Sequence, residues 1–228
     1  NIYITQGGSR NGFIYYDIAN GTWNKLPNLP TIADYGSQLE YDSETNSIYY
    51  MPGIGKNFFY KYNIESQTWI ELAEIPYTIT AGAALKKVDG NLYLAIGNST
   101  NIYKYNIAKN YWMVPTMGLF GGWWRGTDSR SFGYGTDIVK GDGDNYYLTR
   151  GNYDNLFVRY NPKTGEIVKM ADAPAGFTNG GDLTYDNVRN KVYAIASPYY
   201  RKLFVYDVAT DVWSEVVGDP PPLDPDEG

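Results

Sequence analysis

Aromatic and polar residues along the chain follow a pattern that recurs five times. In the first copy, residues 13–26 (FIYYDIANGTWNKL), an aromatic-rich stretch ends at Tyr16-Asp17, a polar turn follows, and Trp23 opens a second stretch seven residues after Tyr16. Two strand-like stretches around a short turn predict a β-hairpin. The same frame returns as Tyr62-Asn63 with Trp69, Tyr105-Asn106 with Trp112, Tyr160-Asn161 with Ile167, and Tyr206-Asp207 with Trp213. The chain is therefore a repeat protein.

Further strands precede each hairpin. A strand with a central tyrosine lies 12 or 13 residues before each Tyr-Asp or Tyr-Asn pair, and a small residue that suits a tight turn or positive φ follows four positions later. These tyrosines are Tyr3, Tyr49, Tyr93, Tyr147 and Tyr193, and the small residues are Gly7, Gly53, Gly97, Gly151 and Ser197. In the last four copies another strand comes first, with a Gly-x-x-Leu/Ile pattern that starts at Gly36, Gly82, Gly135 and Gly180. Four antiparallel strands at a period of 43 to 55 residues are typical of β-propeller blades.

The sequence thus predicts an all-β propeller of about five visible blades, each with strands a, b, c and d in chain order. The first blade lacks its innermost strand, a. Residues 218–228 read as an acidic, proline-rich linker or tail, which cannot supply the missing strand because proline removes ladder donors. The chain begins inside a strand pattern, so we expect it to be part of a longer polypeptide. We place the propeller at 1–217, with blades near 1–28, 34–73, 81–117, 133–172 and 180–217.

The repeat resembles the kelch repeat. The paired glycines Gly7-Gly8 after strand b, the Tyr-Asp that ends strand c and the tryptophan seven residues later are landmarks of that family, and the resemblance covers Asn1 to Val217. Only the first copy has both glycines, and Ile167 replaces the fourth tryptophan, so the chain is similar to a divergent kelch-type propeller. Kelch propellers usually close with about six or seven blades. The resemblance therefore implies either a five-bladed ring or part of a larger one.

Histidine and cysteine are both absent, which excludes disulfides, thiol or imidazole metal sites, and catalysis that needs either residue. Galactose-oxidase-like copper chemistry, familiar on kelch propellers, needs histidine ligands and a cysteine-linked tyrosine, so we expect no cofactor and no metal. The 19 basic residues are scattered among 25 acidic ones, which predicts no nucleic-acid partner. The apolar runs are strand-length, so we expect no membrane insertion by this segment.

One predicted face of the propeller carries the long loops. Its longest segment, Val114–Tyr134, holds Trp123, Trp124, Arg125 and Arg130 among glycines. Indoles beside a guanidinium suit stacking on a sugar ring or anchoring a protein partner. The alternative is that both tryptophans fold back and plug the central channel. A second aromatic and basic cluster on this face consists of Tyr199, Tyr200, Arg201 and Lys202.

The inner strands contribute polar residues to the predicted channel: Gln38, Glu40, Asp137 and Asp182. Paired carboxylates could act as acid and base or bind a hard cation, but we favour the interpretation that the aspartates cap backbone N–H groups of loops. The turn at 141–145 (GDGDN) has calcium-like spacing, yet a plain hairpin turn explains it better. The recurring strand tyrosines and tryptophans are predicted to be core residues, because a single binding site breaks repeat symmetry.

Two Asn-x-Ser/Thr triplets, at Asn20 and Asn98, fall in predicted turns and are candidates for N-glycosylation. Together with the acidic linker and the lack of thiols, they favour an extracellular or cell-surface location. A cytosolic adaptor is the alternative.

These features predict a non-catalytic module that binds a glycan or a protein through its long-loop face. One alternative is a structural propeller in a surface layer or filament, assembled with neighbouring chains that fill the missing strand or contact the tryptophan loop. The other is a His-independent carbohydrate-active lyase or epimerase. Its candidate residues are Arg125, Arg130, Asp137 and Asp182.

Overall fold

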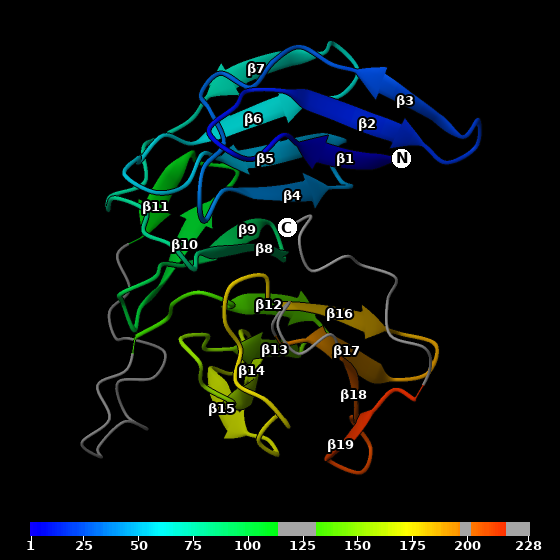
Figure 1. The fold of residues 1–228 in the computed structure, drawn as a ribbon. Helices are drawn as coiled ribbons and strands as arrows, with labels where there is room; N and C mark the ends of the chain where they lie inside the picture. Colours follow the sequence, from blue (N-terminus) through cyan, green and yellow to red (C-terminus); the bar gives the residue numbers. More distant parts are fainter. Residues whose placement is uncertain (114–130, 197–201, 218–228) are drawn as a thin grey trace. The chain divides into compact units, whose positions relative to one another are not determined.

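The computed structural model describes residues 1–113, 131–196 and 202–217, and within them every regular element is a β-strand (Figure 1). The strands form five antiparallel sheets, each a meander of consecutive strands. The predicted all-β propeller of five blades is confirmed, and so is the three-stranded first blade. The chain divides into two compact units, Asn1–Ser129 and Arg130–Gly228. Among the described residues, no helix is long and apolar enough to cross a membrane.

The first unit contains blades 1, 2 and 3. Blade 1 has the order β1-β2-β3, which are its strands b, c and d. Blades 2 and 3 have all four strands, β4 to β7 and β8 to β11, and their inner strands β4 and β8 lie in contact. The strands are β1 (Ile2–Thr5), β2 (Phe13–Asp17), β3 (Thr22–Lys25), β4 (Gln38–Asp42), β5 (Ser47–Met51), β6 (Tyr60–Asn63), β7 (Thr68–Glu71), β8 (Ala84–Val88), β9 (Asn91–Ala95), β10 (Ile102–Asn106) and β11 (Tyr111–Met113).

The second unit contains blades 4 and 5, each with four described strands in the order a, b, c, d. Their inner strands, β12 and β16, also lie in contact. The strands are β12 (Asp137–Lys140), β13 (Tyr146–Thr149), β14 (Phe157–Asn161), β15 (Glu166–Lys169), β16 (Asp182–Asp186), β17 (Lys191–Ile195), β18 (Leu203–Asp207) and β19 (Val212–Glu215).

The turn between strands c and d has a common backbone in all five blades. The Asp or Asn that ends strand c accepts backbone hydrogen bonds within the turn, as when Asp17 Oδ1 accepts from the N–H of Ala19 at 3.0 Å. The residue five positions after the strand-c tyrosine has a positive φ, which glycine, asparagine and aspartate tolerate best. These residues are Gly21, Gln67, Asn110, Gly165 and Asp211, so Gln67 departs from the pattern.

The core between neighbouring blades is built on an aromatic contact that recurs three times. A buried phenylalanine at the start of strand c packs between the strand-c tyrosine and the strand-d tryptophan of the next blade. Such ring pairs contribute about 0.5–1.5 kcal/mol beyond their burial. The ring centroids lie 5.2 and 5.3 Å apart for Phe13 with Tyr62 and Trp69, 5.0 and 5.2 Å for Phe59 with Tyr105 and Trp112, and 4.9 and 4.9 Å for Phe157 with Tyr206 and Trp213.

The tryptophan also ties its blade to the linker of the preceding blade. Trp112 Nε1 donates to the carbonyl oxygen of Ala73 at 3.0 Å, and Asn110 Oδ1 accepts from the N–H of Ala73 at 2.8 Å. Both backbone groups of this linker residue are therefore satisfied by the next blade. The second unit has the same two bonds: Trp213 Nε1 donates to the carbonyl oxygen of Ala171 at 3.0 Å, and Asp211 Oδ1 accepts from the N–H of Ala171 at 2.8 Å.

Blade 1 has the same tyrosine-tryptophan pair, but its indole is exposed to solvent. Tyr16 and Trp23 have centroids 4.9 Å apart, within the 4.8 to 5.1 Å of the three equivalent pairs. Trp23 is nevertheless 61% exposed.

We expect Trp112→Ala to lower the free energy of unfolding by about 3 kcal/mol, because it removes a packed indole and its bond to the linker. Trp23→Ala, at the same position of blade 1, is expected to cost about 1 kcal/mol or less, because that indole is largely solvated. Urea unfolding followed by circular dichroism measures both. Equal losses would contradict the contact pattern described above.

Buried tyrosines are expected to lower the free energy of unfolding at alkaline pH. Burial raises the pKa of Tyr105 to about 12, and it also raises the pKa values of Tyr49, Tyr50, Tyr147 and Tyr206. The pKa of buried Tyr105 is higher in the folded state than the ordinary value of 10.0, so the unfolded state loses its proton first as pH rises. The contribution of neutral Tyr105 to the free energy of unfolding is therefore complete below pH 10 and is lost as pH rises towards 12.

We therefore expect the tyrosinate absorbance at 295 nm to rise in two stages. Part of this absorbance should appear only well above pH 10, because the buried tyrosines ionise there, together with unfolding seen by circular dichroism. Titration of every tyrosine near pH 10 with retention of the native spectrum would be inconsistent with this burial.

Candidate interaction site

Most ligand-binding residues predicted from the sequence lie outside the described residues. The residues outside the described parts of the chain are 114–130 and 197–201, from the two loops of the predicted site, and the proline-rich segment 218–228. Their roles stay predictions. The residues concerned are Trp123, Trp124, Arg125, Arg130, Tyr199, Tyr200 and Arg201.

The inner-strand carboxylates join neighbouring blades. Asp137 Oδ2 accepts from the N–H of Leu183 in β16 at 2.8 Å, while Oδ1 accepts from the N–H of Ile138 at 2.7 Å. In the first unit Glu40 Oε1 accepts from the N–H of Lys87 in β8 at 2.8 Å. Both contacts cap backbone N–H groups, as the sequence favoured for the aspartates, but these N–H groups belong to the next inner strand and not to a loop. Asp182 lies exposed on β16.

The turn at 141–145 closes on itself as a hairpin turn. The N–H of Gly141 donates to the carbonyl of Asn145 at 2.9 Å, and Asp142 Oδ1 accepts from the hydroxyl of Tyr147 at 2.9 Å. Across the described residues, no three His, Cys, Asp or Glu side chains converge as metal ligands do.

Both candidate glycosylation sites are exposed. Asn20 lies in the β2–β3 turn, where its Nδ2 donates to Asp17 Oδ2 at 2.8 Å. Asn98 lies in the turn after β9 and has a positive φ of 59°. Their modification stays a prediction.

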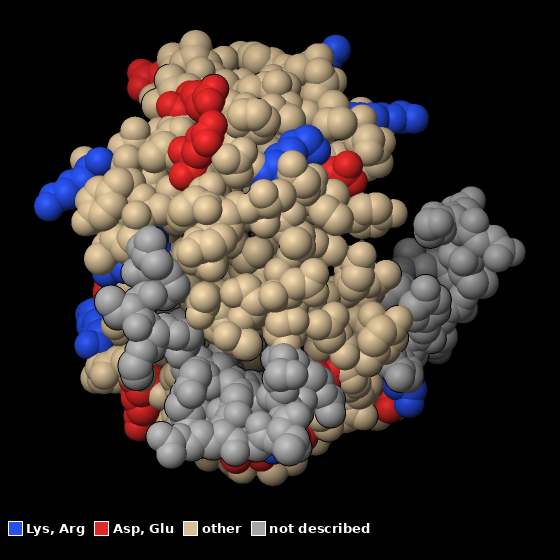
Figure 2. All heavy atoms as spheres, turned by 90° about the vertical axis from the view of Figure 1, so that its left-hand side faces the viewer, with Lys and Arg blue, Asp and Glu red and all other residues tan. Residues whose placement is uncertain are grey.

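Charged side chains are dispersed on the face drawn in Figure 2. Lys and Arg are separated there by uncharged residues and by Asp and Glu. Elsewhere in the described chain, exposed lysines pair with acids, as Lys163 does with Asp144 at 2.9 Å and Lys202 does with Glu215 at 2.8 Å. The absence of a nucleic-acid partner stays a prediction.

Strand β1 has one open hydrogen-bonding edge. The N–H of Gln6 donates to the carbonyl of Gly12 at 2.8 Å, which makes these opposed residues a hydrogen-bonded pair of the β1–β2 ladder. Because such pairs alternate along an antiparallel ladder, the backbone groups of Tyr3 and Thr5 point away from β2. In the other four blades strand a pairs with this side of strand b, whereas β1 has no second neighbour among the described strands.

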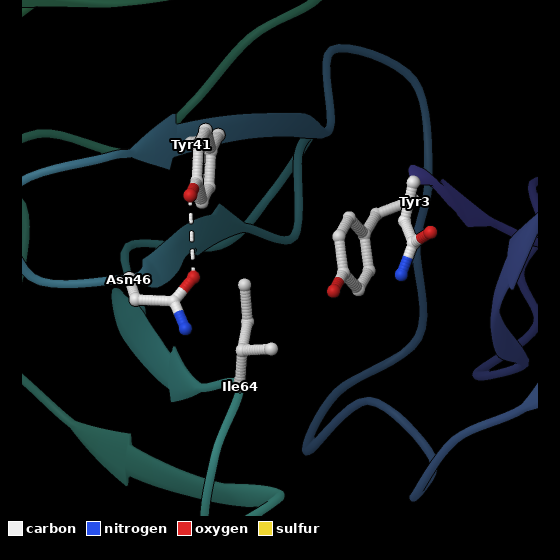
Figure 3. Close-up of a pocket in the computed structure, with 5 residues that line it drawn as sticks. Tyr3, Tyr41, Asn46 and Ile64 are labelled. Atoms are coloured by element: carbon white, nitrogen blue, oxygen red, sulfur yellow. Dashed lines mark hydrogen bonds between the residues drawn. The ribbon is translucent and has the colours of Figure 1, made fainter. Parts of the chain in front are cut away.

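A pocket lies beside this open edge (Figure 3). Its lining comes from Tyr3 and Asn1 of blade 1 and from Tyr41, Asn46 and Ile64 of blade 2. Tyr41 belongs to β4, and its hydroxyl donates to Asn46 Oδ1 at 3.2 Å. The pocket therefore joins the open side of blade 1 to the inner strand of the next blade.

The pocket is aromatic and polar, and its side chains are uncharged at neutral pH. Burial raises the pKa of the Tyr3 hydroxyl above 10.0; a hydrogen bond with the Asn1 side chain opposes this, and the nearby Tyr15 and Tyr41 add to it. Tyr3 thus stays neutral and can both donate and accept a hydrogen bond. The sequence assigned Tyr3 to the repeated core, and only the missing strand makes it a pocket residue.

Gly7, which follows β1, also borders unfilled space. A Cβ added at the equivalent Gly53 would lie 2.5 Å from the carbonyl oxygen of Tyr35, in the segment that leads into strand a of the same blade. Gly97 and Gly151 face the corresponding segments of blades 3 and 4 in the same way. A Cβ at Gly7 would meet nothing within 4 Å. The glycine of blade 1 therefore has room for a backbone segment.

The buried hydroxyl of Tyr62 has no hydrogen-bond partner among the described residues. Its counterparts donate to the residue five positions later, Tyr105 to Asn110 and Tyr206 to Asp211, both at 2.7 Å. Blade 2 has Gln67 there. The linker residue of the preceding blade is Pro27, which accepts from Trp69 Nε1 at 3.5 Å but has no N–H to offer.

Comparison with known proteins supports the propeller fold. No protein-family model matches the sequence, and no curated protein matches it. Among the solved structures that match, one described as "Structure of YjhT" has a TM-score of 0.65 at 18% sequence identity, covering 86% of this chain and 69% of that chain. At this identity the likeness shows the fold alone, and the kelch assignment of the repeat stays a prediction.

We expect Gln67→Asn to raise the free energy of unfolding by about 1 kcal/mol, because asparagine tolerates the positive φ and offers Tyr62 an acceptor. In a Tyr62→Phe background the gain should shrink to the contribution of the turn alone. Urea unfolding of the four variants gives the coupling energy. An equal gain in both backgrounds would show that Tyr62 gains no partner.

Proposed function

We propose that this protein is a non-catalytic interaction module of an extracellular or cell-surface polypeptide, and that it binds a protein partner at the open inner side of blade 1. The observation that carries the proposal is the edge of β1, where Tyr3 and Thr5 present backbone groups beside an aromatic pocket. Pairing of a partner strand with such an edge supplies main-chain hydrogen bonds, and the neighbouring pocket supplies side-chain selectivity.

The contacts of the inner-strand carboxylates support binding in preference to catalysis. Asp137 and Glu40 each accept a backbone hydrogen bond from the next blade at 2.8 Å. A general acid or base must reach a proton of the substrate. Using either group in this way would break a bond between blades.

The exposed turns that contain Asn20 and Asn98 support the extracellular assignment, together with the absence of cysteine thiols. The landmarks Gly7-Gly8, Tyr16-Asp17 and Trp23 support a kelch-type propeller. Glycan recognition through Trp123, Trp124 and Arg125 is a second candidate, which rests on the pairing of indoles with a guanidinium in the sequence.

Amide hydrogen exchange of the purified chain, followed by ¹H–¹⁵N NMR, tests whether the edge is available. We expect the amides of Tyr3 and Thr5 to exchange nearly as fast as those of an unfolded peptide. The amides of Tyr49 and Met51 hold the same positions in blade 2 and should be protected by pairing with β4. Equal protection at the two sites would mean that the edge is already covered, and the proposal would be wrong.

A further inference from the structure

We propose that Tyr134 and Tyr153, on two adjoining loops of blade 4, bind an uncharged oligosaccharide. Tyr134 lies in the turn that leads into strand a, and Tyr153 lies in the loop between strands b and c. Both belong to the second unit, so this site stands or falls independently of the edge of β1 in the first unit.

Tyr153 has a backbone conformation that a bulky side chain disfavours. Its φ is 62°, and among the described residues it is the one aromatic residue with a positive φ. Ser9 of blade 1 and Gly55 of blade 2 hold the same position, two residues after the glycine that follows strand b, and they also have positive φ. Tyrosine at this position costs free energy that a glycine would not. Strain of this kind is concentrated at functional sites.

Blade 2 forms the same loop without the tyrosine. The N–H of Tyr153 donates to the carbonyl of Phe177 at 2.7 Å, and the N–H of Gly55 donates to the carbonyl of Ile79 at 2.9 Å. The return bond, to the carbonyl of the following loop residue, is 2.8 Å long in blade 4 and 2.9 Å in blade 2. The loop backbone therefore does not require a side chain at this position.

Both tyrosine rings are open to solvent, on loops whose backbones are in contact. Tyr153 is 76% exposed and Tyr134 is 42% exposed. The N–H of Asn152 donates to the carbonyl of Tyr134 at 2.9 Å, which places the turn of Tyr134 beside the loop of Tyr153. Side chains exposed to this extent add little to core packing, and they are accessible to a ligand.

The loop that carries Tyr153 is stabilised by a buried ion pair. Arg150 and Asp154 flank Gly151, Asn152 and Tyr153, and their buried side chains pair with each other. Removing two charges from water costs free energy, so the pair indicates a loop whose conformation matters. A loop that is rigid before binding loses less conformational entropy when a ligand binds.

The surface around the two rings has no exposed charge. It is formed by residues 131–136, 150–156 and 173–181, which adjoin through the backbone bonds given above. The charged residues of these segments are Arg150 and Asp154, and both are buried. The exposed positions are occupied by tyrosine, asparagine, proline and glycine.

An uncharged sugar matches this surface. A tyrosine ring packs against the C–H groups of a pyranose, while its hydroxyl and the asparagine amides exchange hydrogen bonds with sugar hydroxyls. These segments offer no exposed cation to a carboxylate or sulfate, which disfavours an acidic sugar. A protein partner would bury about 800 Å² on each side. Tyr134 and Tyr153 are the only exposed large hydrophobic side chains of these segments, which is little for an interface of that size.

The test is a titration of the purified chain with neutral tetrasaccharides of glucose, mannose and N-acetylglucosamine, followed by ¹H–¹⁵N NMR. At least one of them should shift the amides of Tyr134, Asn152 and Tyr153 saturably. Tyr153→Gly should weaken this binding at least about tenfold. It should not lower the midpoint of thermal unfolding, because glycine accepts the positive φ and the ring lost is largely solvated.

Tyr35→Ala is the matched control. Tyr35 holds the turn position in blade 2 that Tyr134 holds in blade 4, and it is 71% exposed, but the adjoining loop has Gly55 in place of Tyr153. This variant should bind the sugar as the unchanged chain does. Binding that survives Tyr153→Gly, or that falls equally in Tyr35→Ala, would show that the sugar binds elsewhere, and the proposal would be wrong.

Two further results would overturn the proposal. One is the absence of any shift with all three neutral tetrasaccharides at millimolar concentration. The other is tighter binding at these amides of a uronic-acid oligosaccharide or of a proline-rich peptide, which would assign the surface to a different class of ligand.

Discussion

Packing of blade 1 on blade 2, of blade 2 on blade 3 and of blade 4 on blade 5 depends on one phenylalanine that contacts a tyrosine and a tryptophan of the second blade. Phe13, Phe59 and Phe157 each occupy this position, and each is fully buried. The contact demands a flat ring at the start of strand c and an indole seven residues after the next tyrosine. In these three interfaces the seven-residue spacing of the tyrosine and the tryptophan places both rings on the same phenylalanine.

Blade 1 leaves sites unfilled that the described strands fill in the other blades. Blade 1 has its tyrosine-tryptophan pair in the usual geometry, yet Trp23 is exposed. It also keeps Tyr3 and Gly7, whose counterparts are covered by strand a or by the segment leading into it. The proposed interaction site lies where these two residues are left uncovered by the described strands.

Polar groups in the described chain are used chiefly to connect blades. Asn110 and Asp211 satisfy the N–H of a linker, while Glu40 and Asp137 satisfy the N–H of the next inner strand. Each of these groups carries a structural bond that catalysis would have to break. This use of Glu40 and Asp137 supports the proposal of a binding role over the lyase or epimerase alternative.

The sequence by itself determined the strand order, the blade count and the absence of strand a from the first blade, because each depends on spacing along the chain and on the two-residue period of a strand. It also indicated that inner-strand carboxylates cap backbone groups. Only the tertiary structure decided that Tyr3 lines a pocket with Tyr41, that Gly7 faces unfilled space, and that Tyr62 lacks the partner its counterparts have. Those properties depend on atoms of a neighbouring blade or of the missing strand, and a repeat pattern gives every blade the same residue without showing what that residue meets.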